Sequence, residues 1–247
     1  MKDSFFKNYS KNHVHFYDEA FPAFLELGFD LISEVEKPSI ADLGCGDGRL
    51  LFALNKRGLL DRFSEIVGVD ISPKRIERLT KELPFIKGII SDASNVKDYL
   101  SSSFDYIVCS QVIEHVQDDT TLVAEIKRLL KCGGVAFISS VIKHRCSFYV
   151  YYTNGSFSLD PTHVREYSSI DEFVSLIKSK GFEIINIDTC QITFPFLDLV
   201  YRLFGKFGLI EPDSSFFQKY KSLADLRKLR IPIIGYKNIA ILVRKNE

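Results

Sequence analysis

The sequence has few features of a secreted, membrane or nucleic-acid-binding protein. Lys plus Arg and Asp plus Glu both number 32, so the formal net charge is zero. Such a balance gives no overall attraction to duplex nucleic acid. No apolar run is long enough for a membrane span or the core of a signal peptide, because charged residues interrupt each one. We therefore expect no nucleic-acid partner and no transmembrane segment.

The sequence also lacks paired cysteines and repeats. The cysteines are scattered, and none forms a C-x-x-C pair; they are Cys45, Cys109, Cys132, Cys146 and Cys190. An odd, dispersed set is typical of reduced thiols rather than of a disulfide framework or a zinc site, so a cytoplasmic location is expected. At 247 residues and 46% hydrophobic, the chain can bury the core of one large domain, alone or with a small cap.

What the sequence does contain is a regular alternation of short apolar runs and amphipathic segments. Strands are predicted at 39–43, 65–70, 85–91, 104–109, 135–141, 182–187 and 236–244. Helices are predicted at 47–57, 73–83, 118–130 and 170–180, with one or two more before residue 36. The pair Gly133-Gly134 is expected to end the 118–130 helix. Such alternation indicates an α/β fold, with a mostly parallel sheet covered on both faces.

Residues 40–49 read Ile-Ala-Asp-Leu-Gly-Cys-Gly-Asp-Gly-Arg, an apolar strand followed by three glycines at alternate positions. Glycines at a strand-to-helix turn permit positive φ and let a ligand approach the backbone. In a dinucleotide-binding turn, G-x-G-x-x-G, the third glycine would fall at Arg49. The observed pattern, D-x-G-x-G-x-G, resembles instead the first motif of class I S-adenosylmethionine (SAM)-dependent methyltransferases.

Three predicted strands carry an aspartate at or just after their carboxyl ends: Asp42, Asp70 and Asp92. Aspartate is a poor strand residue and needs partners if it is buried, so these positions have no simple structural explanation. Ligands of parallel sheets bind at this edge, and an acid roughly twenty residues past the glycines can reach a ribose. A carboxylate there can accept from both ribose hydroxyls.

The segment Cys109–Val116 (Cys-Ser-Gln-Val-Ile-Glu-His-Val) resembles the stretch after the fourth strand in small-molecule methyltransferases of the ubiquinone-biosynthesis type. The segment 129–134 is also similar, although the family usually has proline where Cys132 stands. The resemblance covers residues 38–141 and extends more loosely to 187. It implies a doubly wound, Rossmann-like, seven-stranded sheet with an antiparallel last strand and helical cap elements. It also implies a SAM-dependent methyltransferase of EC class 2.1.1.

The resemblance implies SAM as the cofactor and S-adenosyl-L-homocysteine as the product. The turn of Gly44, Gly46 and Gly48 would lie beneath the methionine portion, with Asp42 facing its ammonium group. Asp70 would bind the ribose, Ile71 would pack on the adenine, and Asp92 would accept from the adenine amino group. The full set of expected cofactor-binding residues is Asp42, Gly44, Cys45, Gly46, Asp70, Ile71, Asp92, Ala93, Ser110, Gln111 and His115.

Three of the polar residues in these motifs have plainer alternatives. Asp47 is expected to cap the 47–57 helix rather than bind a ligand. Asp92 can instead cap a helix over 95–100. His115 is expected to be a packed, hydrogen-bonded histidine more than a catalytic one.

The acceptor side is predicted to follow the fifth strand, where Asp160–Ser168 resembles a P-x-H-x-x-x-Y element of many small-molecule methyltransferases. His163 is the candidate general base, because an imidazole titrates near neutrality. An equal alternative is a histidine that braces the loop through hydrogen bonds. The candidate substrate residues are Tyr17, His144, Arg145, Tyr152, His163 and Tyr167.

Other chemistries leave no trace in the motifs. Residues 110–113 lack the N/D-P-P-Y/F signature of enzymes that methylate amino groups of nucleic acids, and residues 141–145 lack the carboxylates of a catechol-type magnesium site. The sequence thus predicts in-line methyl transfer, without a metal, to an oxygen or nitrogen atom of a small molecule. The alternatives are a noncatalytic SAM-binding protein and, disfavoured by Arg49, an NAD-type oxidoreductase.

Four parts of the chain are expected. Residues 1–36 would form an N-terminal helical cover and residues 37–188 the SAM-binding core. Residues 189–235 would form a helical insertion, because Phe194–Phe207 and Ser214–Arg230 have amphipathic patterns. That insertion would cap the acceptor or form a homodimer contact, in preference to touching lipid. Residues 236–247 would supply the last strand.

Overall fold

The structure, a computed structural model, describes residues 21–148, 151–153, 156–195 and 229–246. Its main feature is a seven-stranded sheet with the strand order β3-β2-β1-β4-β5-β9-β8. The five strands from β3 to β5 pair in parallel, whereas β9 runs antiparallel to both β5 and β8. The predicted fold class and the antiparallel last strand are therefore confirmed.

The bounds of most elements agree with the sequence prediction to within a few residues. The large sheet contains β1 (Ser39–Leu43), β2 (Glu65–Asp70), β3 (Lys87–Ile90), β4 (Phe104–Ser110), β5 (Leu130–Lys143), β8 (Glu183–Pro195) and β9 (Arg230–Arg244). The helices are α2 (Phe24–Asp30), α3 (Arg49–Lys56), α4 (Pro73–Glu82), α5 (Asp119–Leu129) and α6 (Ile170–Ser179). A small hairpin pairs β6 (Tyr151–Thr153) with β7 (Ser156–Ser158), which was not predicted.

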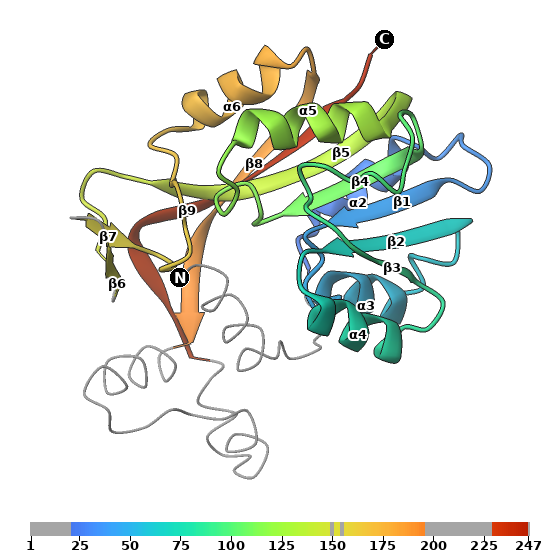
Figure 1. The fold of residues 1–247 in the computed structure, drawn as a ribbon. Coiled ribbons are helices and arrows are strands. Elements are labelled where there is room, and N and C mark those ends of the chain that lie inside the picture. Colours follow the sequence, from blue (N-terminus) through green and yellow to red (C-terminus); the bar gives the residue numbers. More distant parts are fainter. Residues whose placement is uncertain (1–20, 149–150, 154–155, 196–228, 247) are drawn as a thin grey trace.

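Helices cover both faces of the sheet (Figure 1). On one face α2, α3 and α4 pack on a core that includes Leu79 and Tyr106. On the other face α5 and α6 pack on a core that includes Leu122 and Ile107. Neighbouring residues of β4 thus point to opposite cores, which is why its sequence is continuously apolar. Each fully buried leucine contributes roughly 1.5–3 kcal/mol.

Side-chain caps begin two of the helices. The Asp118 carboxylate accepts from the N–H groups of Thr120 and Thr121 at the start of α5, and Ser169 accepts from Glu172 N at the start of α6. Ser72 occupies the N-cap position of α4, as predicted, but its side chain makes no capping hydrogen bond. Its N–H donates instead to Asp70 Oδ1, at 2.8 Å, and so ties the start of α4 to the end of β2.

Three local predictions are wrong. Helix α5 ends at Leu129, ahead of Gly133-Gly134, because β5 already begins at Leu130 and the glycines lie where its pairing with β4 skips from Leu130 to Val135. No helix forms over 95–100; Asp92 accepts from Ser94 N in a turn instead. The N-cap of α3 is Gly48, and Asp47 makes ion pairs.

The segment 189–235 differs from its prediction at both ends. Strand β8 continues through Thr189–Pro195 and β9 begins at Arg230, so these ends extend the antiparallel pair rather than forming helix. The middle of the segment, like residues 1–20, lies outside the described residues. Within the described part of the chain, no helix has the length and apolar character needed to span a membrane.

Candidate functional site

The glycine turn lies at the carboxyl end of β1, beside the point where the strand order reverses between β1 and β4. The N–H groups of Gly44 and Cys45 both donate to Val69 O, at 2.7 and 2.9 Å, which fixes the turn to β2. Gly44 has a φ of 76°, and a Cβ there would lie 2.4 Å from Val112 Cγ2. Only glycine fits this position, because both the backbone and the neighbouring side chain exclude a methyl group.

Asp70, at the end of β2, is built into the same turn. Its Oδ2 accepts from Gly46 N at 3.0 Å, and its Oδ1 accepts from Ser72 N at 2.8 Å. Burial raises the pKa of this carboxyl, and the two backbone hydrogen bonds and Arg75 oppose that shift. Each carboxylate oxygen keeps a second lone pair for a ligand hydroxyl. The next residue, Ile71, is 66% exposed, which offers an apolar surface to a flat ligand ring.

Arg75 and Asp47 also belong to this site, although neither was predicted to bind a ligand. Arg75 Nε lies 3.8 Å from Asp47 Oδ1, and Arg75 Nη1 lies 3.8 Å from Asp70 Oδ2. Arg78 Nη1 also approaches Asp47 Oδ2, at 3.3 Å. The three-residue spacing of Arg75 and Arg78 places both on one face of α4, a signal that the sequence does contain. The network holds α4 against the glycine turn.

Asp42 and Cys45 are buried beside the turn. Burial, with Asp70 nearby, raises the pKa of Asp42 to about 7. A cationic ligand group next to Asp42 would favour its ionised form, as the predicted ammonium contact requires. The Cys45 side chain packs in the core beneath α4 while its backbone lies in the turn, and burial raises the pKa of its thiol.

The remaining cofactor candidates lie at the ends of β3 and β4. Asp92 is exposed and Ala93 is buried beside it. Ser110 Oγ lies 3.0 Å from Ser139 Oγ on β5, and Gln111 N donates to Ser139 O. Gln111 has a φ of 56°, an uncommon conformation for a residue other than glycine and one that clusters at functional sites.

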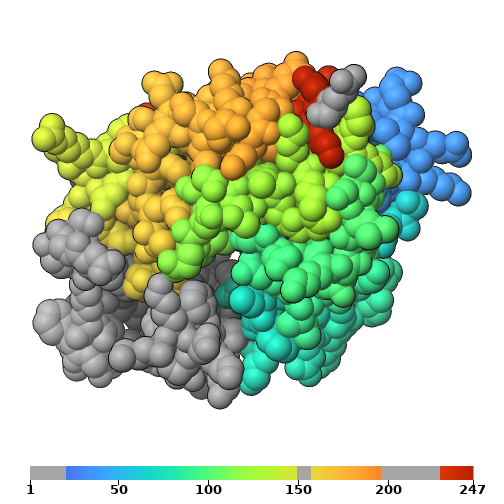
Figure 2. Space-filling view, turned by 45° about the horizontal axis from the view of Figure 1, so that its top comes forward, coloured from blue at the N-terminus to red at the C-terminus, as the bar shows by residue number. Residues whose placement is uncertain are grey.

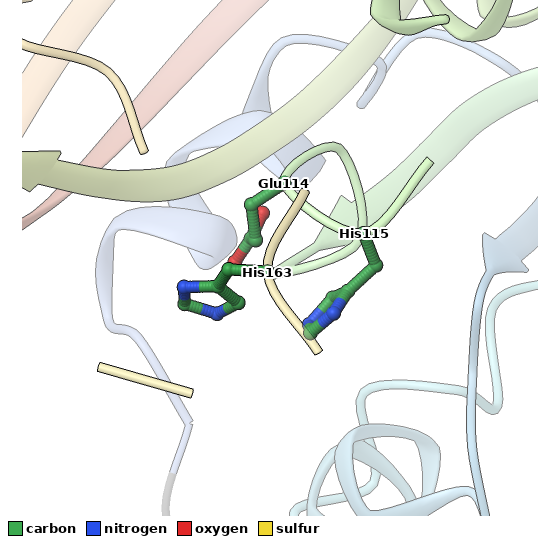
Figure 3. A group of neighbouring side chains, drawn as sticks. All are labelled: Glu114, His115 and His163. Atoms are coloured by element: carbon green, nitrogen blue, oxygen red, sulfur yellow. The ribbon is translucent and has the colours of Figure 1, made fainter. Parts of the chain in front are cut away.

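Beyond Gln111, three titratable side chains converge from two loops (Figure 3). Glu114 and His115 follow β4, and His163 comes from the loop after β7; their ligand atoms lie within 4.8 Å of one another. The His115 and His163 rings meet edge-on, with centroids 4.9 Å apart. The structure thus brings the predicted base beside a residue predicted on the cofactor side.

His115 is held as a neutral ring in one tautomer. Thr162 Oγ1 donates its single proton to Asp160 Oδ1, so it accepts at 2.9 Å from His115 Nδ1, which must carry the proton. Burial and His163 lower the pKa of His115 to about 4. The expectation of a hydrogen-bonded histidine is therefore met.

Glu114 is fully buried and incompletely bonded. Its Oε2 accepts from Ser140 Oγ at 3.0 Å, whereas its Oε1 has no hydrogen-bond partner among the described residues. Burial raises the pKa of Glu114 to about 7, against the opposing influence of His163. Sequence reasoning gave Glu114 no separate role. Glu114, His115 and His163 together offer one carboxylate and two imidazoles, a set of ligands that can hold a divalent cation. The sequence predicted no metal.

The loop around His163 is fastened to the segment after β4. Arg165 donates from Nη1 to Ile113 O and Val116 O and from Nη2 to Gln117 O, at 2.6–3.1 Å. Val164 N donates to Glu114 O at 2.8 Å. Figure 2 shows the two segments in contact on the surface.

The other predicted substrate residues have no described contact with the cluster of Glu114, His115 and His163. Tyr167 is buried, and its hydroxyl donates to Asp119 Oδ2 at 2.9 Å, so it is a core residue and its predicted substrate role is not supported. His144 and Arg145 are exposed in the loop after β5. Tyr17 and the side chain of Tyr152 lie outside the described residues.

Comparison with known proteins agrees with this geometry. Residues 41–138 match a family described as a methyltransferase domain. The ubiquinone biosynthesis O-methyltransferase of Paracidovorax citrulli is 25% identical over 154 residues, which are 59% of this chain and 63% of that protein. The match therefore spans less than two thirds of that relative's length.

Two solved structures share the fold. The YcgJ protein of Bacillus subtilis is 17% identical with a TM-score of 0.62, covering 91% of this chain and 99% of that one. A phosphoethanolamine N-methyltransferase 2 of Haemonchus contortus, solved with SAM, is 16% identical with a TM-score of 0.55, covering 90% of this chain and 53% of that one.

The strand order defines a Rossmann-like fold, and folds of this kind bind their ligands at the carboxyl ends of the strands, where the glycine turn, Asp70 and Ser110 lie. Residues 41–138 match a methyltransferase domain, so this part of the chain is similar to class I SAM-dependent methyltransferases and, more distantly, to the ubiquinone biosynthesis O-methyltransferases. SAM is the cofactor of this class. The glycine cradle, the exposed Ile71 and the buried Asp42 fit its methionine, adenine and ammonium groups.

Proposed function

We propose that the protein transfers the methyl group of SAM to an oxygen or nitrogen atom of a small acceptor molecule. The proposal rests on one observation: a candidate cofactor site and a candidate acceptor site lie next to each other at the same edge of the sheet. On the cofactor side, Asp70 is bonded to Gly46 in the glycine turn. On the acceptor side, His163 is held next to His115 and Glu114 by a loop that docks on the segment after β4.

The chemistry follows from this arrangement. SAM supplies a methyl group that its sulfonium activates, and the acceptor takes this methyl group by in-line attack. Alignment by the chain's own groups can lower the barrier by roughly 7–11 kcal/mol. When the acceptor is a hydroxyl, Nε2 of His163 takes its proton. Neither role needs a metal ion.

The acceptor-side segments extend this proposal. We place the acceptor over the Glu114, His115 and His163 cluster. His144 and Arg145, exposed in the loop after β5, stay candidate contacts for it. We keep the predicted division into an N-terminal cover over 1–36 and a core over 37–188, with the last strand beginning at Arg230 instead of at 236. The insertion between β8 and β9 would cap the acceptor or join two copies of the chain.

The cofactor half is tested by titration calorimetry with SAM and with NAD. SAM should bind and NAD should not. Asp70→Asn removes a charged hydrogen-bond acceptor worth roughly 1.5–3 kcal/mol, so it should weaken SAM binding roughly 10–100-fold. Asp98→Asn, at an exposed position after β3, is the control and should bind as the wild type does. Tight binding of NAD without binding of SAM would overturn the proposal.

The transfer half is tested with methyl-labelled SAM and the small-molecule fraction of a cell lysate. Label should move to a small product. Binding of SAM with no transfer to any fraction would point to a noncatalytic SAM-binding protein. A chelator should leave the rate unchanged, and a rate that falls with chelator and returns with a divalent cation would contradict the metal-free mechanism.

A further inference from the structure

Glu166 is the most heavily bonded carboxylate on the acceptor side. Its Oε1 accepts from His163 Nδ1 and Leu159 N, both at 2.8 Å, and from Ser158 Oγ at 3.1 Å. Its Oε2 lies 3.3 Å from Lys143 Nζ. The His163 and Glu166 side chains are each only 6% exposed. Five groups including Tyr236 therefore surround one carboxylate next to His163.

This environment keeps Glu166 ionised. Burial favours the neutral acid, but the hydrogen bonds from His163 and Leu159 N, together with Lys143, prevail and lower the pKa of Glu166. An ionised carboxylate has no proton to donate and can only accept. The proton between Glu166 and His163 therefore belongs to Nδ1 of the imidazole.

The second ring nitrogen is then available for chemistry. With Nδ1 protonated, neutral His163 carries a lone pair on Nε2, and no hydrogen bond occupies Nε2 within the described residues. His115, whose Nδ1–H donates to Thr162 Oγ1, lies across from His163 (Figure 3).

We propose that Glu166 is the positioning residue of this methyltransferase, which fixes His163 in the tautomer that can accept a proton at Nε2; this rests on the proposed function. During transfer to a hydroxyl acceptor, the oxygen–methyl bond forms and the sulfur–methyl bond breaks. The hydroxyl proton moves to Nε2, and S-adenosyl-L-homocysteine leaves. Glu166 stabilises the imidazolium that results, because its negative charge lies against Nδ1–H. The same division of roles operates in Ser-His-Asp triads.

The first test is the tautomer itself, read by ¹⁵N NMR of histidine-labelled full-length protein. The His163 signal is assigned by its loss in His163→Gln. Neutral His163 should be protonated at Nδ1 and bare at Nε2. A wild-type ring protonated at Nε2 would overturn the proposal, and this measurement needs neither a Glu166 variant nor an acceptor.

The second test is Glu166→Gln, which keeps the shape of the side chain. A carboxamide can accept or donate, so both His163 tautomers should become populated. Methyl transfer in the labelled-SAM assay should fall roughly 10²-fold or more, with the Kd for SAM unchanged. Glu172→Gln, whose carboxylate accepts from Ser168 and does not contact His163, is the matched control.

The outcomes separate the two proposals. A Glu166→Gln protein with wild-type turnover and a single Nδ1–H tautomer would exclude a positioning role. Wild-type protein that binds SAM but methylates nothing would overturn the proposed function, while the tautomer measurement would still decide how Glu166 orients His163.

Discussion

At the scale of single residues, the glycine turn gives the sharpest prediction. Gly44→Ala places a methyl group at positive φ, which costs about 1–2 kcal/mol, and drives it to 2.4 Å from Val112. Gly133→Ala is the matched control, because Gly133 has a φ of 77° but nothing within 4 Å of the added Cβ. Gly44→Ala should therefore lower the free energy of unfolding more than Gly133→Ala does, and should also weaken SAM binding.

Urea unfolding of both variants checks this prediction, with calorimetry for SAM. Equal losses in the two variants would mean that the contact with Val112 relaxes freely and that only the backbone conformation matters. An unaffected Kd for SAM in Gly44→Ala would contradict the placement of the methionine portion over this turn.

The residues that could be predicted are those whose partners are near in sequence or whose spacing is distinctive. Asp70 was predicted because it ends an apolar strand at a set distance from the glycines. Glu166 was not, although His163 is only three residues away, because no periodic pattern shows that this loop turns the two side chains toward each other. Its partners Lys143 and Tyr236 come together only when β5 and β9 pair. Arg75 was missed although its spacing from Arg78 places both on one face of α4, because the sequence does not show that this face packs toward Asp47.

At the scale of elements, Arg165 fastens the acceptor loop to the segment after β4. Arg165→Ala would leave the carbonyls of Ile113, Val116 and Gln117 without this donor and remove the ion pair with Asp119. The loss of such hydrogen bonds costs roughly 1–3 kcal/mol. Hydrogen exchange at Val164 N–H, which donates to Glu114 O, should become faster, and methyl transfer should fall.

Arg62→Ala provides the comparison. Arg62 also donates to two backbone carbonyls, those of Phe29 and Ile32 near the end of α2, far from the acceptor loop in the sequence. Its replacement should speed exchange near α2 and leave Val164 unchanged. Protection at Val164 that survives Arg165→Ala would show that the backbone bonds to Glu114 hold the loop without the guanidinium.

Strands and helices could be predicted where a single pattern, either a continuous apolar run or a helical repeat of apolar residues, extends over the whole element. Strands β1 and β2 agree with prediction at both ends, because each is a continuous buried run that ends at a glycine or aspartate. The β6–β7 hairpin was missed, since three-residue strands give no periodic signal. The extension of β8 past residue 188 was also missed, because its first three residues, 189–191, are exposed and the extension is ordered by its pairing with β9.

At the scale of the whole molecule, the buried carboxyls set how stability depends on pH. Burial raises the pKa of Asp42 from 3.8 to about 7 and that of Glu114 from 4.5 to about 7. At a pH between its ordinary pKa and its raised native pKa, each of these carboxyls holds a proton in the native state that it has released in the unfolded chain. The free energy of unfolding should therefore fall as the pH rises toward 7, by up to roughly 1.4 kcal/mol per pH unit for each group.

Asp42→Asn isolates one of these contributions. Asparagine has the shape of the protonated acid but cannot ionise, so the variant should lose less stability than the wild type between pH 5 and pH 7 in urea unfolding without SAM. Carboxyls with lowered pKa, such as Asp105, affect both proteins equally at lower pH and cancel in the difference. If both proteins lose the same free energy over this interval, Asp42 is already ionised at pH 5 and the buried carboxyl is not the source of the pH dependence.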